Sequence, residues 1–329
     1  MARAWSLKSR PAGLPGPEHF ELVDIADAPL ADGEVRVRNS WLSVDPYMRG
    51  RMNDVKSYVP PFNLNEPLGG GAVGVVEESR AEGFAPGDRV LHMLGWRDVA
   101  TGPAKEFTKL PAGGAPDQLF LGLLGMPGMT AYFGLLSVAE AKAGETVFVS
   151  AAAGAVGSAV VQIAKLKGMT VVGSAGGADK CALVRDLGAD AAIDYKAEGS
   201  LISKLNAAAP QGIDVYFDNV GGDHLDAALA LARDNARFAM CGMIESYNSL
   251  EPLSLRYAMR IVGARLRLQG FIVMDFFHRM AEFHAEMGGW AAAGKLKSPE
   301  TVRDGLEATP DAFRALFSGG NTGKMLVRL

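Results

Sequence analysis

A turn of small residues between a predicted strand and a predicted helix is the segment whose spacing points most directly to chemistry. The apolar run Val147-Phe-Val leads into Ala152, Gly154 and Gly157, and residues 158–167 follow with a helical apolar pattern. Backbone N–H groups and the dipole at such a helix N-terminus can hold a pyrophosphate. Alanine stands where the first glycine of the usual glycine-rich turn would be, and the other two glycines keep their spacing.

A turn of this kind also occurs where a strand and a helix simply pack closely, and that alternative requires no ligand. The surrounding pattern favours a ligand, because a strand precedes the turn, a helix follows it, and a second strand is predicted at 170–173. The sequence therefore predicts dinucleotide binding, with the pyrophosphate held by Gly154, Ala155, Val156 and Gly157.

The end of the second predicted strand indicates which dinucleotide binds. In NAD-specific folds an acidic residue about 20 residues beyond the turn binds the ribose 2′-hydroxyl. Counting from Gly154 leads to Ser174 in a stretch of small residues, and Asp179 comes only later, at a predicted helix start. A carboxylate there would repel a 2′-phosphate, whereas Lys180 supplies a compact positive charge. A lysine in the first turn of a helix is often merely solvated. Because no acidic residue stands at the end of the second strand, however, Lys180 favours NADPH, and the predicted cofactor is NADP(H).

Residue counts exclude several other kinds of function. Only two cysteines occur, Cys181 and Cys241, so neither a disulfide framework nor a cysteine-based zinc cluster is expected. The five histidines are scattered and form no H-x-x-x-H pair, which argues against a metal site. A net charge of −4 argues against nucleic-acid binding. Without a signal peptide or an apolar run of about 18 residues, we expect a soluble, cytoplasmic protein with no membrane contact.

The elements that must position these residues change in character along the chain. Residues 1–122 contain short apolar runs between prolines and glycines, which predict an irregular β-rich domain with strands at 35–39, 72–77, 89–93 and 106–109. From Met129 onward, strands and helices alternate, which predicts an α/β fold with a parallel sheet. Its six strands are predicted at 146–150, 170–173, 191–195, 215–219, 237–241 and 266–271, and its helices include 158–167, 179–187, 225–233 and 274–293. A final helix is predicted at 311–317 and a final strand at 324–329, and both are expected to return to the first domain.

Seven segments of the chain identify a protein family far more specifically together than any one of them does alone. They are Leu42-Ser-Val-Asp-Pro-Tyr-Met-Arg49, Gly125-Met-Pro-Gly-Met-Thr-Ala-Tyr132, Ala151-Ala-Ala-Gly-Ala-Val-Gly-Ser158, Phe217-Asp-Asn-Val-Gly-Gly222, Cys241-Gly-Met-Ile-Glu-Ser-Tyr-Asn248, Gln269-Gly-Phe-Ile-Val273 and Gly320-Asn-Thr-Gly-Lys324. In this order and spacing the chain resembles the zinc-independent alkenal/prostaglandin reductase branch of the medium-chain dehydrogenase/reductase superfamily. Bacterial members of that branch include NADPH-dependent curcumin reductases. The resemblance extends over nearly the whole chain.

This resemblance implies a fold and a domain arrangement. A GroES-like β-rich catalytic domain would span residues 1–122, and a Rossmann domain with a doubly wound parallel sheet would span 123–295. Residues 296–329 would return to the catalytic domain. The family also implies a homodimer and a small hydrophobic enal or enone as the substrate.

The resemblance further implies roles for individual residues. Lys180 and Tyr195 would contact the 2′-phosphate, and Asn219 would contact the cofactor after the fourth strand of the sheet. Tyr47 and Tyr247 resemble the tyrosines that line the enone pocket. The residues that would run past the ribose and nicotinamide, or close the site from the tail, are Cys241, Gly242, Met243, Ile244, Tyr247, Phe271, Ile272, Val273 and Asn321.

Several of these residues also have a simpler structural explanation. Tyr195 could cap a strand end with its ring packed, and Asn219 could be a turn residue. Cys241, in a predicted buried strand, is expected to behave as a small apolar residue and not as a nucleophile. Tyr47 could be a packed surface aromatic. Tyr247 is the better-supported tyrosine, because it lies beyond the carboxyl end of a strand, where such sheets bind ligands.

The predicted lack of a zinc site favours an activated alkene over an alcohol as the substrate. The carbonyl of a conjugated enone accepts the electron pair when hydride adds to the β-carbon, so the protein needs only to orient the alkene and stabilise the enolate oxygen. We expect Tyr247, with a ribose hydroxyl of the cofactor, to stabilise this oxygen, and Tyr47 to be the second catalytic residue. An NADPH quinone reductase and a non-catalytic dinucleotide-binding sensor remain as alternatives.

Overall fold

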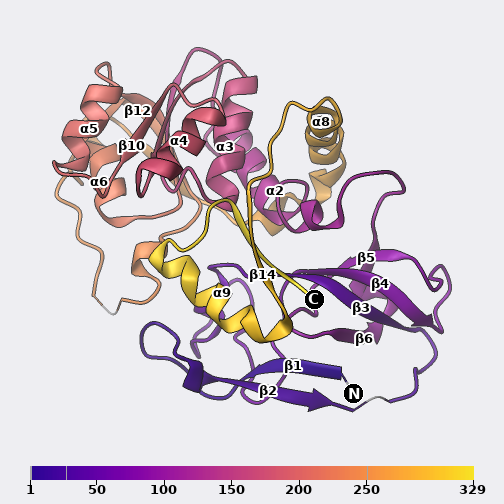
Figure 1. Cartoon of the computed structure of the whole chain (residues 1–329). Coiled ribbons are helices and arrows are strands. Elements are labelled where there is room, and N and C mark those ends of the chain that lie inside the picture. The colour runs from indigo at the N-terminus through magenta and orange to yellow at the C-terminus, as the bar shows by residue number, and fades with distance from the viewer. Residues whose placement is uncertain (1, 27, 250) are drawn as a thin grey trace. The chain divides into compact units, whose positions relative to one another are not determined.

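The computed structural model describes residues 2–26, 28–249 and 251–329. The chain divides into two compact units. The first unit contains the described residues up to Leu121 together with Glu300–Asn321 and Met325–Leu329, and the second contains Gly122–Pro299 and Thr322–Lys324. Figure 1 labels their helices and strands.

The second unit is built on a parallel sheet of six strands. In chain order these are β8 (Thr146–Val149), β9 (Thr170–Ala175), β10 (Ala191–Asp194), β11 (Ile213–Asp218), β12 (Ala232–Met240) and β13 (Arg267–Gly270). They lie in the order β10-β9-β8-β11-β12-β13, so the chain starts in the middle of the sheet and winds outward first one way and then the other. This strand order is that of a dinucleotide-binding Rossmann sheet, and the predicted α/β fold is confirmed.

Helices cover both faces of this sheet. They are α2 (Met126–Phe133), α3 (Ala155–Leu166), α4 (Ala178–Asp186), α5 (Leu201–Ala208), α6 (Gly222–Leu231), α7 (Arg260–Gly263) and α8 (Met280–Ala292). Figure 1 shows α5 and α6 on one side of the sheet and α2 and α3 on the other. Between sheet and helices, the rings of Phe148 and Tyr216 stack at 5.2 Å and Phe238 meets Tyr216 edge-on at 5.3 Å. Each fully buried side chain of this size contributes about 1.5–3 kcal/mol.

Most predicted elements of this unit differ by one to three residues from their bounds in the structure, and three differences are notable. The predicted strand 237–241 begins earlier, at Ala232, and ends at Met240, so Cys241 lies just beyond the strand. The helix predicted over 225–233 is α6, which ends at Leu231 because the chain then becomes β12. The single helix predicted over 274–293 is wrong, since the 3-10 helix η6 (Val273–Arg279) precedes α8.

The first unit is a β-rich domain with a seven-stranded sheet. Its strands follow the order β14-β15-β3-β4-β5-β7, and β6 pairs with β3, while β1 and β2 form a separate two-stranded sheet. The bounds are β1 (Ala2–Leu7), β2 (Phe20–Ile25), β3 (Glu34–Ser43), β4 (Ala72–Ser79), β5 (Arg89–His92), β6 (Val99–Pro103), β7 (Phe107–Lys109), β14 (Glu300–Asp304) and β15 (Lys324–Arg328), with helices α1 (Met48–Arg51) and α9 (Thr309–Ala315). Because β15 pairs antiparallel with β3, the end of the chain belongs to the same sheet as Glu34–Ser43.

The core of the first unit gathers around one tryptophan. Trp96 is 1% exposed, its ring meets Phe313 of α9 at 5.6 Å, and it lies 5.9 Å from Phe20 of β2. Its indole nitrogen donates a hydrogen bond to the carbonyl oxygen of Ser43 at 3.3 Å. The C-terminal helix therefore completes a core that strands near the N-terminus begin.

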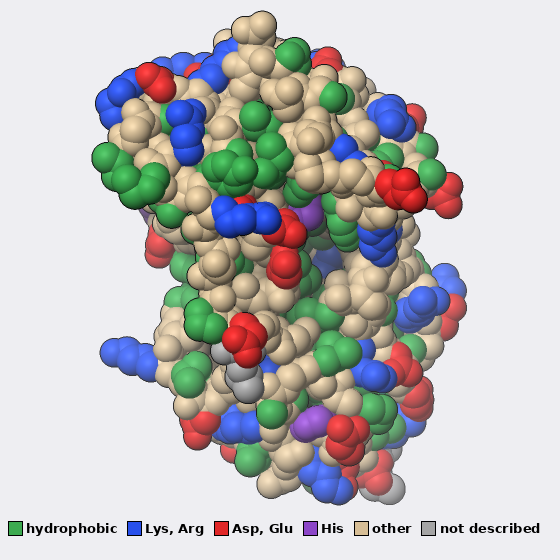
Figure 2. Space-filling model, turned by 90° about the vertical axis from the view of Figure 1, so that its left-hand side faces the viewer, with side chains coloured by type: hydrophobic (Ala, Val, Ile, Leu, Met, Phe, Trp, Pro, Cys, Tyr) green, Lys and Arg blue, Asp and Glu red, His purple; other side chains and the backbone are tan. Residues whose placement is uncertain are grey.

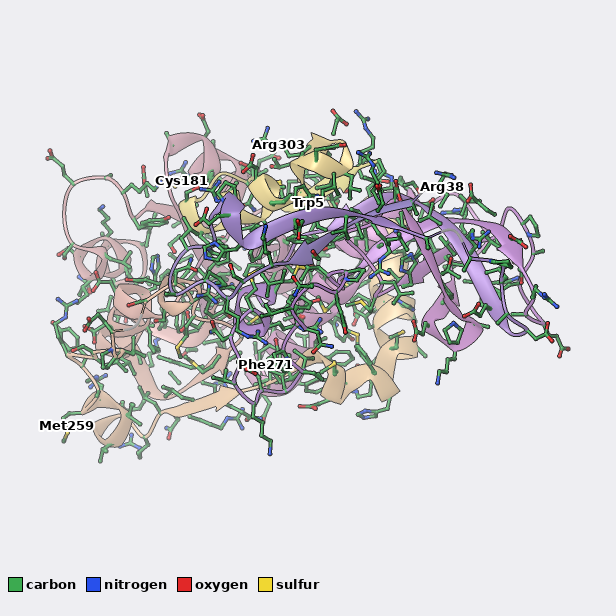
Figure 3. All side chains as sticks on the ribbon, turned by 90° about the horizontal axis from the view of Figure 1, so that it is seen from below. Trp5, Arg38, Cys181, Met259, Phe271 and Arg303 are labelled. Atoms are coloured by element: carbon green, nitrogen blue, oxygen red, sulfur yellow. The ribbon has the colours of Figure 1, made fainter. Side chains whose placement is uncertain are left out.

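The surface carries charges of both signs. Figure 2 shows blue and red side chains interspersed over the face in view. Among the residues that the structure describes, the most exposed large apolar side chain is that of Met259, 79% exposed, which Figure 3 labels in the second unit. Within the described ranges, no helix combines the length and the apolar character that crossing a membrane requires.

Candidate functional site

The turn between β8 and α3 has the geometry of an anion-binding helix N-terminus. Gly154 is the N-cap of α3, in extended conformation, and no side chain caps the first turn. The backbone amides of Ala155, Val156 and Gly157 begin the helix there. A Cβ built on Gly157 would lie 2.2 Å from the carbonyl oxygen of Ala151, so only glycine allows the helix to come this close to the strand end. These features fit a bound pyrophosphate, because the backbone and the helix dipole are left to bind it.

A segment near the C-terminus lies against this turn. The amide of Gly323 donates to the carbonyl oxygen of Ala153 at 2.7 Å, and Gly323 also forms a bridge with Gly154. The amide of Lys324 donates to the carbonyl oxygen of Pro299 at 2.9 Å. Thr322–Lys324 is thus part of the second unit, whereas the predicted site residue Asn321 is the last residue of its segment in the first unit.

Polar groups at the ends of β8 and β11 hold the floor of the site together. The amide nitrogen of the Asn219 side chain donates to the carbonyl oxygen of Ser150 at 2.8 Å, and the backbone N–H of Asn219 donates to the Ser150 hydroxyl at 2.8 Å. Asp218 accepts from the Tyr216 hydroxyl at 2.7 Å and from the backbone N–H of Gly221 at 2.8 Å. Burial raises the pKa of the Asp218 carboxyl. Asn219 therefore bonds across to the end of β8, and these bonds do not lie within the turn that follows β11.

Ser150 and Asp218 did not emerge from the sequence reasoning. Each follows a run of apolar strand residues directly, and both are fully buried. A polar residue at the end of a buried strand is a usable signal, because its cost of burial requires hydrogen-bond partners.

The turn between β9 and α4 brings together the two residues predicted to contact a 2′-phosphate. Lys180 lies in the first helical turn of α4, and burial lowers the pKa of its ammonium group. Tyr195 follows β10, and its hydroxyl lies 2.8 Å from where a Cβ on Gly176 would be, over the β9–α4 turn. Its ring packs edge-on against His224 at 5.1 Å, and burial lowers the pKa of that histidine to about 4. At neutral pH His224 is therefore an uncharged packing partner.

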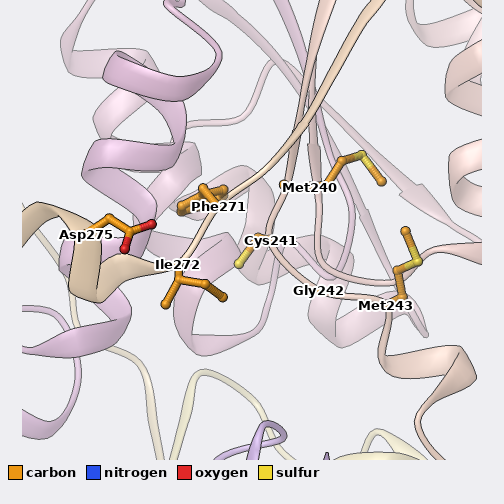
Figure 4. A pocket seen from close by; sticks show the side chains of 8 residues that line it. Met240, Cys241, Gly242, Met243, Phe271, Ile272 and Asp275 are labelled. Carbon is orange, nitrogen blue, oxygen red and sulfur yellow. The ribbon is translucent and has the colours of Figure 1, made fainter. Parts of the chain in front are cut away.

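A pocket of about 380 Å³ opens at the carboxyl ends of β12 and β13. Figure 4 shows the side chains that line it. Five of the residues predicted to lie near the ribose and nicotinamide line this pocket together: Cys241, Gly242, Met243, Phe271 and Ile272. The other lining residues, which the sequence did not single out, are Met240, Gly270 and Asp275. Of the remaining predictions in this stretch, Ile244 begins the 3-10 helix η5 (Ile244–Ser246), and Val273 begins η6.

Burial in this pocket determines the chemistry of Cys241. Burial, and to a lesser extent the nearby Asp218 carboxylate, raise the pKa of the Cys241 thiol to about 12. A thiol with this pKa is protonated at neutral pH and is a poor nucleophile. The side chain therefore acts as an apolar wall of the pocket.

Tyr247 lies next to this pocket. It follows η5, and its hydroxyl oxygen lies 2.9 Å from the position that a Cβ on Gly242 would take. The ring thus folds back over Gly242, one of the pocket residues. A hydrogen-bond donor is thereby placed beside an otherwise mostly apolar wall.

Tyr47 belongs to the first unit and precedes helix α1. Its ring packs against the core around Trp96 and Phe313. Burial, and then the Asp45 carboxylate, raise the pKa of the Tyr47 hydroxyl well above its ordinary value. The hydroxyl consequently stays protonated at any physiological pH and can act only as a neutral donor or acceptor.

The histidine, cysteine and acidic side chains do not converge on a metal site in the described parts of the chain. No three of them lie together in a way that could hold a metal ion. Cys181 and Cys241 are both free thiols.

Comparisons with known proteins agree with this geometry. A family model described as the N-terminal domain of oxidoreductase matches residues 3–110, and one described as zinc-binding dehydrogenase matches residues 155–288. The chain is 44% identical over 334 residues to the NADPH-dependent curcumin reductase of Escherichia coli (strain K12), covering 99% of this chain and 96% of that protein. It is 40% identical over 327 residues to the 2-alkenal reductase (NADP(+)-dependent) of Nicotiana tabacum, covering 98% and 95%.

A solved structure is similar over the same length. The crystal structure of CurA in complex with NADPH from Vibrio vulnificus superimposes with a TM-score of 0.93 at 43% sequence identity. The match covers 99% of this chain and 98% of that chain.

Replacing Gly157 by alanine tests the turn as a dinucleotide site. Because the added Cβ would overlap the Ala151 carbonyl, the helix must move away from the strand, at a cost of about 1–3 kcal/mol. We expect dinucleotide binding, measured by calorimetry, to be lost or greatly weakened. Gly289→Ala in α8 is the matched control, since a Cβ there meets open space. Unchanged binding by the Gly157 variant would contradict the assignment.

The thiol of Cys241 is expected to be unreactive in the folded protein. With Cys181 replaced by alanine, alkylation by iodoacetamide at pH 8 reports on Cys241 alone. Because its raised pKa depletes the thiolate at that pH, we expect the folded protein to react more than about a hundredfold more slowly than the urea-unfolded chain. Similar rates in the two states would show that the thiol is not protected.

Proposed function

The chain belongs to the alkenal/prostaglandin reductase branch of the medium-chain dehydrogenase/reductase superfamily, and from this premise we propose that it uses NADPH to reduce the carbon–carbon double bond of α,β-unsaturated aldehydes and ketones. One observation of the structure carries the proposal: the Tyr247 hydroxyl lies over Gly242, beside the pocket at the ends of β12 and β13. A hydrogen-bond donor next to a mostly apolar pocket suits an enone, which has an apolar alkene and one polar oxygen.

The cofactor site forms the second part of the proposal. Its residues extend along the carboxyl edge of the sheet, from the β9–α4 turn through the N-terminus of α3 to the ends of β12 and β13. The turn geometry, the small residues at the end of β9 and the NADPH-bound relative support NADP(H). The residues that we propose as its contacts are Gly154, Ala155, Val156, Gly157, Lys180, Tyr195, Asn219, Cys241, Gly242, Met243, Ile244, Tyr247, Phe271, Ile272, Val273 and Asn321.

The two tyrosines carry the proposed catalytic roles. When bound, NADPH supplies the hydride that adds to the β-carbon of the substrate. Negative charge then develops on the carbonyl oxygen, and Tyr247 donates a hydrogen bond to it as it does so. Because the raised pKa of Tyr47 keeps that hydroxyl protonated, Tyr47 can orient the substrate but cannot act as a base at neutral pH.

We propose that this chemistry does not depend on zinc. The enone carbonyl accepts the electron pair itself, and the described residues provide no converging set of metal ligands. We further propose that residues 1–122 form the catalytic domain, 123–295 the cofactor domain and 296–329 the return segment. A cytoplasmic homodimer completes the proposal, and the position of β13 at the edge of its sheet is consistent with pairing between subunits.

The reaction is tested by following NADPH oxidation with three acceptors in parallel. A medium-chain 2-alkenal and an aromatic enone are expected to be reduced, with products saturated at the double bond. A simple quinone is the comparison substrate. Activity on the quinone alone would indicate a quinone reductase, and binding of NADPH without turnover of any acceptor would indicate a non-catalytic dinucleotide-binding protein.

The role of Tyr247 is tested by Tyr247→Phe, which removes only the hydroxyl. We expect kcat/KM for the enone to fall by at least about tenfold, equivalent to ~1.4 kcal/mol of transition-state stabilisation. Tyr257→Phe, a change at a partly exposed tyrosine of the same unit, is the control and should leave kcat/KM unchanged. Full activity of the Tyr247 variant would rule out its role at the oxyanion.

A further inference from the structure

The β9–α4 turn has a second lysine beside it that the proposed cofactor contacts do not include. Lys196 directly follows Tyr195 after the end of β10. Its Cε atom lies 2.9 Å from where a Cβ on Gly176 would be, and the Tyr195 hydroxyl lies 2.8 Å from the same position. Both side chains therefore lie over the glycine turn, and a side chain at residue 176 would displace them.

The backbone of Lys196 is tied to the same turn. One oxygen of the Asp194 carboxylate accepts hydrogen bonds from the backbone N–H of Gly177 and from that of Lys196, both at 2.9 Å. Lys204 donates to the carbonyl oxygen of Asp194 at 2.9 Å and to that of Ala197 at 2.5 Å. Asp194 thus couples the position of the Lys196 backbone to the β9–α4 turn. Its carboxylate bonds to backbone amides, and the structure records no ion pair between it and Lys196.

Charges of both signs lie at this turn, because Lys180 and Lys196 are cationic and the Asp194 carboxylate accepts from the Gly177 amide. Lys196 lies close enough to Lys180 for its charge to lower the pKa of Lys180, in addition to the effect of burial. In the described part of the chain, no carboxylate forms an ion pair with the Lys196 ammonium group, which is exposed to solvent. Repulsion between two neighbouring ammonium groups destabilises the folded protein slightly, whereas a bound anion would attract both groups and stabilise it. Two cations and a phenolic hydroxyl around a glycine turn are groups that bind a phosphate dianion, and the Asp194 carboxylate is already held by the backbone amides of Gly177 and Lys196.

We propose that Lys196 is a second cationic ligand of the 2′-phosphate of NADPH, acting with Lys180 and Tyr195 to select NADPH over NADH. The assignment rests on the proposed function for the identity of the cofactor. It gives the turn two positive charges against a dianionic group. Lysine suits this role because its compact ammonium group interacts with phosphate as a point charge from either side of the turn.

Two nucleotide fragments test the proposal without any catalysis. Adenosine 2′,5′-bisphosphate carries the 2′-phosphate and 5′-AMP lacks it, so calorimetry with the full-length chain isolates that group. We expect Lys196→Ala to weaken binding of the bisphosphate by about tenfold, as the loss of a charge-assisted hydrogen bond implies, and to leave 5′-AMP binding unchanged. Lys196→Arg should retain binding of the bisphosphate. Lys180→Ala removes another proposed ligand of the same phosphate, and its loss of affinity for the bisphosphate is the reference value.

A lysine away from the turn provides the control for charge alone. Lys295→Ala removes one exposed positive charge from the same unit and should leave both affinities unchanged. If Lys196→Ala weakens the binding of both nucleotides equally, the residue only supports the loop. If the affinity for the bisphosphate is unchanged, Lys196 does not face the phosphate. Failure of the unmodified protein to prefer the bisphosphate would overturn the 2′-phosphate site as a whole.

Steady-state kinetics separate this proposal from the proposed reaction. With an enone acceptor, Lys196→Ala should raise KM for NADPH, leave KM for NADH unchanged and leave kcat unaltered. If no acceptor is reduced but the fragment affinities change as expected, the reaction is wrong and the role of Lys196 stands. If enones are reduced and neither KM nor fragment affinity changes, the reaction stands and the role of Lys196 is wrong.

Discussion

The close approach of α3 to the end of β8 is the constraint on which the second unit depends. The carbonyl oxygen of Ala151 occupies the space that a Cβ on Gly157 would need, so the helix meets the strand backbone to backbone. Its first-turn amides consequently face the carboxyl edge of the sheet with no side-chain cap. Thr322–Lys324 packs against the same turn through the Gly323 amide, so the end of the chain depends on the same close approach.

Buried polar groups keep the neighbouring strand ends in register with this turn. Ser150 and Asp218 are fully buried, and such groups destabilise a fold unless they are hydrogen-bonded. Ser150 bonds to Asn219, and Asp218 accepts from Tyr216 and from amides of the turn that follows β11. The floor of the site is therefore a hydrogen-bonded polar network in which Oδ1 of Asp218 accepts several bonds and its buried Oδ2 accepts none from the described residues, whereas the pocket beyond it is lined mostly by apolar side chains. This contrast suits a ligand with a charged part and an apolar reacting part.

Sequence reasoning succeeded where a pattern reflects burial and failed where packing decides between similar local structures. The central strands β8, β9 and β11 are largely apolar runs at the predicted places, because a parallel sheet covered on both faces buries nearly every residue of its central strands. The stretch 274–293 has helical apolar spacing throughout, yet Val273–Arg279 is a 3-10 helix. There Phe276 stacks on Phe133 at 4.8 Å and the Arg279 guanidinium lies 4.7 Å from that ring, contacts that apolar periodicity does not encode. Strands β1, β2 and β14 were not predicted, because their residues alternate less clearly between buried and exposed positions. Strand β6 does alternate, but its sequence Val-Ala-Thr-Gly-Pro includes a glycine and a proline, which are uncommon in strands.

By itself the sequence determined the α/β alternation, the glycine turn and the absence of an acid near Ser174, and from these the kind of cofactor. Each is a property of local residue types and spacing. The tertiary structure alone decided which distant residues share a site: Asn219 bonds to Ser150, Cys241 and Phe271 line one pocket, and Lys196 shares a turn with Lys180. Strand order and register bring such residues together, and these arise from packing of the whole sheet, so no local stretch of sequence specifies them.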